Sequence, residues 1–214
     1  MSAPPKKVKF QFQNKIIMNI LIDEKEAIFI KKKIDSARET YKPESIKLLF
    51  IAEAPPEEIK RFFYYEEVKD NDWLYLAIVK ALCENESYNI AKIRANKKKI
   101  LQKLQQDGIY LMDLCPIPLK WGIIAELHKD DFMQRLENEK AIDKSITNII
   151  LIKTNVYDCL YRELKDKQYM VQDKRIPFPS SGQQKRFADM MKKALKAIEY
   201  IPNKGVKEIK ELVY

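Results

Sequence analysis

The sequence contains few residues of the kinds that hold metal clusters. It has three cysteines, Cys83, Cys115 and Cys159, which lie far apart and form no C-x-x-C pair, and one histidine, His128. A cysteine-held zinc ion or iron–sulfur cluster needs about four ligands, and this chain offers no such set. We therefore expect no metal and no other cofactor, and we expect the thiols to be reduced and mostly buried.

Long apolar runs are absent as well. No stretch approaches the ~18 apolar residues of a membrane-spanning helix. Residues 1–9 carry Pro4, Pro5 and charges in place of the apolar segment of a secretory signal. The chain also has no G-x-G-x-x-G, no Walker loop and no nucleophile elbow. These absences predict a cytoplasmic protein without membrane contact.

What the chain has in excess is positive charge. Its 40 Lys and Arg against 31 Asp and Glu give a formal net charge of +9. Such an excess favours a polyanionic partner, most often nucleic acid, although a merely basic protein has the same composition. The expected partner is therefore DNA, single- or double-stranded, and nothing in the sequence specifies an oligomer.

Short apolar runs alternate with helical patterns along the chain. Four segments predict buried strands: Leu48–Ala52, 109–118, Asn148–Thr154 and 168–179. Because helices separate them, the strands should form a parallel sheet covered on both faces. The predicted fold class is α/β, a three-layer α/β/α sandwich with a central, mainly parallel four-stranded sheet.

The length of 214 residues suits one domain. Val8, Phe10 and Phe12 alternate with polar residues, as in a short strand, and Asp23 with Glu26 predicts a capped helix after it. We expect a single domain of three parts: an N-terminal extension, a core and a basic tail helix, at 1–45, 46–200 and 201–214.

Three helices are expected between the first two strands, and Asp72 should cap the middle one, which carries apolar residues from Leu74 to Leu82 on one face. Glu57 and Glu58 suit the first turn of a helix after the first strand. A later helix should carry apolar residues from Ile93 to Leu104 and end at Gly108. After the third strand, Asn155 is expected to cap the next helix.

Ligands of parallel α/β sheets bind at the carboxyl ends of the strands, and three strand ends here carry unusual sequences. They are A-E-A-P-P at 52–56, M-D-L-C-P at 112–116 and P-F-P-S-S-G at 177–182. These resemble, in order, the G-E-A-P-G, N-x-C-P and H-P-S-P motifs of the uracil-DNA glycosylase superfamily. The similarity in order and spacing extends over about residues 46–195, most of the chain.

This resemblance implies a glycosylase that flips a base out of DNA and hydrolyses its N-glycosidic bond. The reaction passes through a cationic sugar, which a nearby carboxylate stabilises. Glu53 stands where the cluster-bearing branch of the superfamily has a glutamate. Asp113 stands where the family usually has a base-reading asparagine. Either Asp113 accepts a hydrogen bond from an exocyclic amine of the base, or it is the catalytic carboxylate in place of Glu53.

The resemblance also implies residues that hold the base and the DNA backbone. Phe63 or Tyr64 is the candidate for stacking on the base. Asp113 and Phe178 complete the base-binding set. The helix after the third motif presents unpaired N–H groups to a phosphate. The expected contacts to the DNA backbone are Pro55, Pro56, Arg175, Ser180, Ser181, Gly182 and Gln183.

The chain departs from the family pattern at important positions. Phe178 replaces the histidine that donates to the leaving base, and losing one such donor typically slows a reaction by ~10²–10³. Pro56 replaces a glycine and has no N–H to donate. Replacement donors near the motifs are Lys153, Lys174 and Arg175.

Three functions are compatible with these residues. The first is a monofunctional DNA glycosylase acting on uracil or another altered base. The second is a nucleic-acid-binding protein that retains the fold without catalysis. The third is a small-molecule α/β hydrolase or nucleotide-binding protein whose strand-end loops hold a phosphate.

Overall fold

The central sheet contains four parallel strands. The computed structural model describes residues 24–68, 70–83, 88–119, 125–145, 147–180, 182–200 and 204–213. The strands are β1 (Leu48–Ala52), β2 (Ile109–Asp113), β3 (Asn148–Leu151) and β4 (Met170–Val171). Their order across the sheet is β2-β1-β3-β4, and every pair is parallel. The predicted fold class is confirmed.

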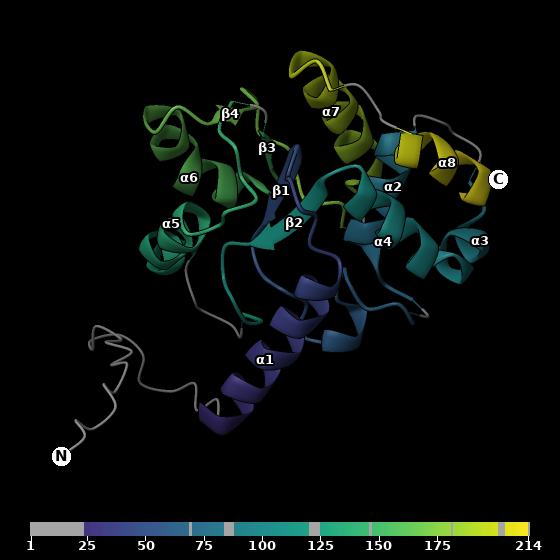
Figure 1. Cartoon of the computed structure of the whole chain (residues 1–214), viewed down its shortest axis with the longest axis horizontal. Coiled ribbons are helices and arrows are strands. Elements are labelled where there is room, and N and C mark those ends of the chain that lie inside the picture. The colour runs from purple at the N-terminus through teal and green to yellow at the C-terminus, as the bar shows by residue number, and fades with distance from the viewer. Residues whose placement is uncertain are drawn as a thin grey trace.

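Helices cover both faces of the sheet. Figure 1 shows α5 and α6 on one side of the sheet and α2, α4 and α7 on the other. The α-helices are α1 (Glu24–Thr40), α2 (Trp73–Cys83), α3 (Ile90–Ala95), α4 (Lys97–Gln106), α5 (Lys129–Glu137), α6 (Thr154–Asp166), α7 (Gln184–Ala197) and α8 (Lys204–Val213). Two short 3-10 helices are η1 (Ile59–Arg61) and η2 (Ala125–His128). None of these described helices is long and apolar enough to cross a bilayer.

The strands are apolar along their whole length because both faces are covered. Every residue of β1 and β2 is buried. β4 is shorter than the predicted segment 168–179, and the chain leaves the ladder after Val171. At that point the side-chain amide of Gln172 bonds to the backbone of Leu151, accepting from its N–H at 3.0 Å and donating to its C=O at 2.9 Å. A parallel bridge between Ile152 and Ile176 then resumes the pairing.

The strand order places a topological switch point between β1 and β3. The chain runs from β1 to β2 on one side and then crosses β1 to reach β3 on the other. Connections on either side of such a point cover opposite faces of the sheet, which leaves a crevice at the carboxyl ends of the two strands. Residues that follow β1 and β3 directly are therefore the first place to look for a binding site.

Several expected elements differ in detail. The helix predicted from Ile93 to Leu104 is two helices, α3 and α4, which meet at Asn96. After Glu58 the chain forms only the 3-10 helix η1. Gly108 follows α4 with φ of 73°, and a Cβ there would lie 2.6 Å from the Ser45 carbonyl oxygen, so only glycine fits. Val8, Phe10, Phe12 and Asp23 lie outside the described residues.

The tail helix α8 packs on its own chain. Val206, Ile209 and Val213 are fully buried, and α8 contacts α2, α3 and α4. The Asp107 carboxylate, at the end of α4, accepts from the backbone N–H groups of Gly205 at 2.9 Å and Val206 at 2.6 Å. This carboxylate satisfies two of the amide groups that a helix start leaves unpaired.

A buried amine lies where α2, α3 and α4 meet. Lys97 is 1% exposed, and its Nζ has no hydrogen-bond partner among the described residues. The Nζ lies 4.3 Å from the centre of the Tyr75 ring. Burial lowers the pKa of Lys97 to about 7, although the nearby Asp72 carboxylate opposes this shift. Asp72 itself accepts two hydrogen bonds from Arg94, at 3.0 and 2.6 Å.

This amine predicts an unusual pH dependence of stability. The pKa of Lys97 is about 7 in the folded chain against an ordinary 10.5, so between these pH values the unfolded chain binds more protons. The free energy of unfolding should therefore rise with pH across this window. Lys97→Met should stabilise the protein at pH 7, by about 1–4 kcal/mol if it behaves like other buried charges replaced by apolar groups. Its advantage should shrink toward pH 10, as measured by urea unfolding.

The matched control is Lys99→Met, on the exposed side of the same helix. It should leave both the stability and its pH dependence nearly unchanged. If Lys97→Met followed the wild-type curve at every pH, the amine would not be desolvated as described.

Candidate active site

A carboxylate, an amine and an amide meet at the switch point. Glu53 directly follows β1, Lys153 lies just after β3, and Asn155 lies in the first turn of α6. The Lys153 Nζ donates to Glu53 Oε2, and the Asn155 Nδ2 donates to Glu53 Oε1. The Glu53 side chain is 20% exposed and that of Lys153 is 40% exposed. The carboxylate is thus held by both oxygens and still open to solvent.

The backbone of Lys153 has an uncommon conformation. Its φ is 87° and its ψ 139°, a region that residues with a side chain rarely adopt. Such a conformation costs of order 1–3 kcal/mol and persists where surrounding contacts impose it. Here the Lys153 N–H donates to the Ile176 carbonyl at 2.9 Å, and the Lys153 carbonyl accepts from the Tyr157 N–H at 3.1 Å. These bonds fix the point from which the amine reaches Glu53.

The third motif runs beside this cluster. Because Ile176 pairs with Ile152, the loop 177–183 begins next to Lys153. Phe178 is half-buried against the core, and its carbonyl accepts from the Ser180 N–H at 2.9 Å. Gly182 is exposed with φ of 78°. The loop ends at Gln183, whose own side chain does not cap the N-terminus of α7. Ser181 lies outside the described residues.

The two prolines of the first motif also lie close to Glu53 in the chain. Pro55 is buried and Pro56 is partly buried. Arg175, before the third motif, is exposed, and its guanidinium forms an ion pair with Asp158 at 2.6 Å. The residues expected to contact the DNA backbone therefore differ in solvent exposure. On the loop, Ser180 and Gly182 are exposed and Gln183 is half-buried.

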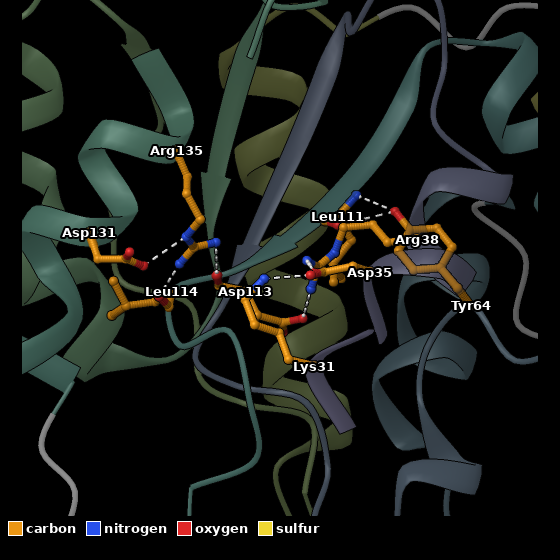
Figure 2. A network of polar contacts seen from close by, with 9 residues as sticks. All are labelled: Lys31, Asp35, Arg38, Tyr64, Leu111, Asp113, Leu114, Asp131 and Arg135. Atoms are coloured by element: carbon orange, nitrogen blue, oxygen red, sulfur yellow. Dashed lines mark hydrogen bonds and ion pairs between the residues drawn. The ribbon is translucent and has the colours of Figure 1, made fainter. Parts of the chain in front are cut away.

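Asp113 lies in a different environment from Glu53. It is 2% exposed, and its Oδ2 accepts from the Arg38 guanidinium of α1 at 2.8 Å. Figure 2 shows this network from close by, with Arg135 of α5 donating to the backbone carbonyls of Asp113 at 3.2 Å and Leu114 at 2.6 Å. Burial raises the pKa of the Asp113 carboxyl, and the charge of Arg38 opposes this rise.

Of the two predicted carboxylates, only Glu53 is accessible to a ligand in this structure. The Asp113 carboxylate is enclosed and joins α1 to the end of β2. A buried carboxylate paired with a buried guanidinium is a common structural arrangement. The role that the resemblance implies for Asp113 requires Arg38 to release it.

The aromatic residues predicted to stack on a base lie in the core. Phe63 is 6% exposed and packs edge-on against Tyr75, with ring centres 5.6 Å apart. Tyr64 is 3% exposed, and its hydroxyl accepts from the Leu111 N–H at 2.7 Å and donates to the Leu111 carbonyl at 3.2 Å. Neither ring presents an open face. Of the three predicted base-binding aromatics, only Phe178, in the loop that begins beside Lys153, is partly exposed.

Two further reactive side chains, Cys115 and His128, have pKa values shifted by burial. Burial, together with the charge of Glu53, raises the pKa of the Cys115 thiol to about 12, so it is not a thiolate near neutral pH. His128 precedes α5, and burial lowers its pKa. Among the described residues, no group of three or more Cys, His, Asp and Glu side chains could hold a metal ion.

Sequence reasoning missed the role of Asn155. It was expected to cap α6, but Lys153 occupies the N-cap position. The Asn155 Oδ1 accepts from the neighbouring Val156 N–H at 3.0 Å, and its amide donates to Glu53. The available signal was its position directly after the predicted strand Asn148–Thr154, two residues from Lys153.

Substitutions in the Arg38–Asp113 pair test whether the Asp113 carboxylate is structural. Arg38→Met should leave a buried carboxylate without a partner and lower the free energy of unfolding by about 3–5 kcal/mol. The double variant Arg38→Met/Asp113→Leu should recover most of that loss, because it removes both buried charges. Urea unfolding of the three proteins measures both effects.

Lys31→Met, which removes a half-exposed ion pair with Asp35 on the same helix, serves as the control. It should change stability by less than about 1 kcal/mol. An Arg38→Met protein as stable as the wild type would contradict the described pairing of Asp113.

No family model matches this chain, and neither a curated protein nor a solved structure does. The likeness to uracil-DNA glycosylases therefore depends on the three strand-end motifs in the order in which the chain carries them.

Proposed function

We propose that this protein is a DNA glycosylase that hydrolyses the N-glycosidic bond of uracil or another altered base after flipping the nucleotide out of the stack. One observation carries the proposal. The Glu53 carboxylate, at the switch point of a parallel sheet, is held by Lys153 and Asn155 and remains open to solvent. This is the place where such sheets bind ligands.

Glu53 supplies the negative charge that the reaction needs. As the bond to the base breaks, positive charge develops on the sugar ring, and a carboxylate beside C1′ stabilises it. The same carboxylate aligns the attacking water. Hydrogen bonds from Lys153 and Asn155 leave lone pairs on both Glu53 oxygens, so the group can still accept from that water.

Lys153 is the best placed of the proposed replacement donors. Phe178 cannot donate to the leaving base, as the family histidine does. Arg175 is exposed and paired with Asp158, and Lys174 is exposed beside it. The Lys153 ammonium lies at the site itself and carries a positive charge that favours a departing anionic base.

The surface next to the site suits a DNA backbone. Helix α7 follows the loop 177–183, and its buried residues are Phe187, Met191, Ala194 and Leu195. Five exposed cations fall on the opposite side of the helix: Lys185, Arg186, Lys192, Lys193 and Lys196. None of the five forms an ion pair with another described residue, and Asp189 is the single acid among them. We expect a protein of this kind in the cytoplasm, bound to single- or double-stranded DNA.

A second candidate is a nucleic-acid-binding protein without catalysis. Phe178 in place of a donor and the enclosed carboxylate of Asp113 favour it. Both candidates use the basic side of α7, and they differ in whether Glu53 acts on the bound nucleotide.

Glu53→Gln decides between the two candidates. The substitution keeps the shape of the side chain but removes its charge, so base removal should slow by about 10²-fold or more. The assay uses a panel of single- and double-stranded oligonucleotides that each carry uracil, hypoxanthine, xanthine or a modified cytosine. Alkali then reveals abasic sites as strand breaks on a denaturing gel.

The matched control is Glu57→Gln, an exposed glutamate four residues further along, which should retain the wild-type rate. If the wild-type protein binds these oligonucleotides but forms no abasic site in any of them, the glycosylase proposal is wrong and the non-catalytic candidate stands.

Binding to DNA should depend on the exposed cations of α7. Replacing Lys185 and Arg186 with alanine removes two charges from its first turn. If both contact phosphates, the slope of log K against log salt should become shallower by about 1.4–1.8. Fluorescence anisotropy with a labelled oligonucleotide, measured at several salt concentrations, gives this slope.

The charge-matched control replaces Lys32 of α1 and Lys99 of α4, which are also exposed. It should keep the wild-type slope. Equal slopes for the α7 variant and the wild type would exclude α7 as the phosphate-binding surface.

A further inference from the structure

We propose that Lys153 also acts as a nucleophile on the sugar after the base has left, forming a Schiff base that leads to strand cleavage. This inference deepens the proposed function and rests on it. It assigns to the protein a lyase step on abasic DNA in addition to base hydrolysis.

The geometry puts an amine in direct contact with the carboxylate that is proposed to face the reacting carbon. The Lys153 Nζ contacts Glu53 Oε2 directly. If Glu53 lies against C1′ to stabilise the cationic sugar, then an amine in contact with the same carboxylate reaches C1′ by rotation of its own side chain. With 40% of that side chain exposed, the amine is also open to a bound substrate.

The carboxylate provides the proton transfer that this chemistry needs. A lysine attacks a carbonyl only after its ammonium group has lost a proton. Glu53 is within hydrogen-bond reach of that proton, and the opposite Glu53 oxygen is held by Asn155. Lys153 forms no ion pair with any other described carboxylate, so Glu53 is the base available to it.

The backbone explains why this lysine is held in place. Lys153 sits in its strained conformation, with φ of 87°, because its N–H is bound to the Ile176 carbonyl at 2.9 Å. The bond from its amine to Glu53 also orders the side chain, so Lys153 loses less side-chain freedom in reaching one carbon atom than a surface lysine without such a bond. Among the described residues, Lys174 is such a lysine, exposed on the loop after β4.

The step balances without an oxidant or a reductant. The abasic deoxyribose opens to an aldehyde at C1′, and the neutral amine adds to this carbon while the carbonyl oxygen takes up a proton. Loss of water, assisted by protonated Glu53, gives the iminium ion. Removal of a C2′ proton then breaks the bond between C3′ and its oxygen, and the 3′ phosphate leaves. Hydrolysis of the imine finally releases Lys153 and the unsaturated sugar aldehyde.

Borohydride trapping tests the inference directly. The full-length protein is mixed with a labelled oligonucleotide that carries one preformed abasic site, and sodium borohydride reduces any imine to a stable amine bond. A covalent protein–DNA band should appear on a denaturing gel, and mass spectrometry of its peptides should locate the link at Lys153. Lys153→Arg should lose the band, because guanidinium does not form the imine under these conditions.

Lys174→Arg is the matched control and should trap as the wild type does. Thermal melting and anisotropy on the same oligonucleotide establish that Lys153→Arg folds and binds DNA. A band that persists in Lys153→Arg, or a link that maps to another amine, would overturn the assignment.

The preformed abasic site separates this inference from the proposed function. If the wild-type protein removes a base from the panel but gives no trapped band, the Schiff-base step is wrong and the glycosylase proposal stands. If a band linked to Lys153 forms but no base is ever removed, the base-removal step is wrong and the assignment of the amine stands.

Discussion

The burial of the central sheet on both faces is the constraint on which the rest of the structure depends. Strands covered on both sides must be apolar throughout, so every residue of β1 and β2 is buried, and all but the final Asp113 of these two strands are uncharged. Charged side chains therefore lie where the strands end. Since all four strands are parallel, those residues collect along one edge of the sheet. The meeting of Glu53 and Lys153, from segments 100 residues apart, follows from this arrangement.

The two carboxylates differ in exposure because they stand one residue apart in the register of the sheet. Asp113 is the last residue of β2 and pairs with Ala52, so it still belongs to the ladder and is enclosed by α1. Glu53 is the residue after Ala52 and has left the ladder, although its carbonyl still accepts from the Cys115 N–H at 2.8 Å. Environment, rather than residue type, decides which carboxylate is structural and which is open to a ligand.

The sequence predicted the fold class because its signals are local: apolar runs, helical periodicity, and glycine or proline at their ends. It also placed Glu53 and the loop 177–183 at one edge of the sheet. It did not predict the Arg38–Asp113 pair, because no local pattern links residues 75 positions apart. Nor did it predict that Phe63 and Tyr64 are buried. An aromatic residue that fills the core and one that stacks on a ligand cannot be distinguished by residue type or by position in the sequence. Asn155 was misread because an asparagine before a helix usually caps it, whereas here its amide is bound to Glu53.

The positions of the cations say more about a binding surface than the net charge does, because many of the described cations are paired with carboxylates and others are not. Many cations of the chain, such as Arg38, Arg94 and Lys153, are neutralised by carboxylates. The unpaired cations of α7 are different, because they share one side of a single helix whose other side is buried. This helix begins where the loop 177–183 ends, and that loop begins beside Lys153. A polyanion bound along α7 would therefore extend along the loop 177–183, whose first residue follows the backbone contact between Ile176 and Lys153. The basic helix and the Glu53 carboxylate are far apart in the sequence. The pairing of two apolar residues, Ile152 and Ile176, brings the chain that leads into α7 next to Lys153, which contacts Glu53.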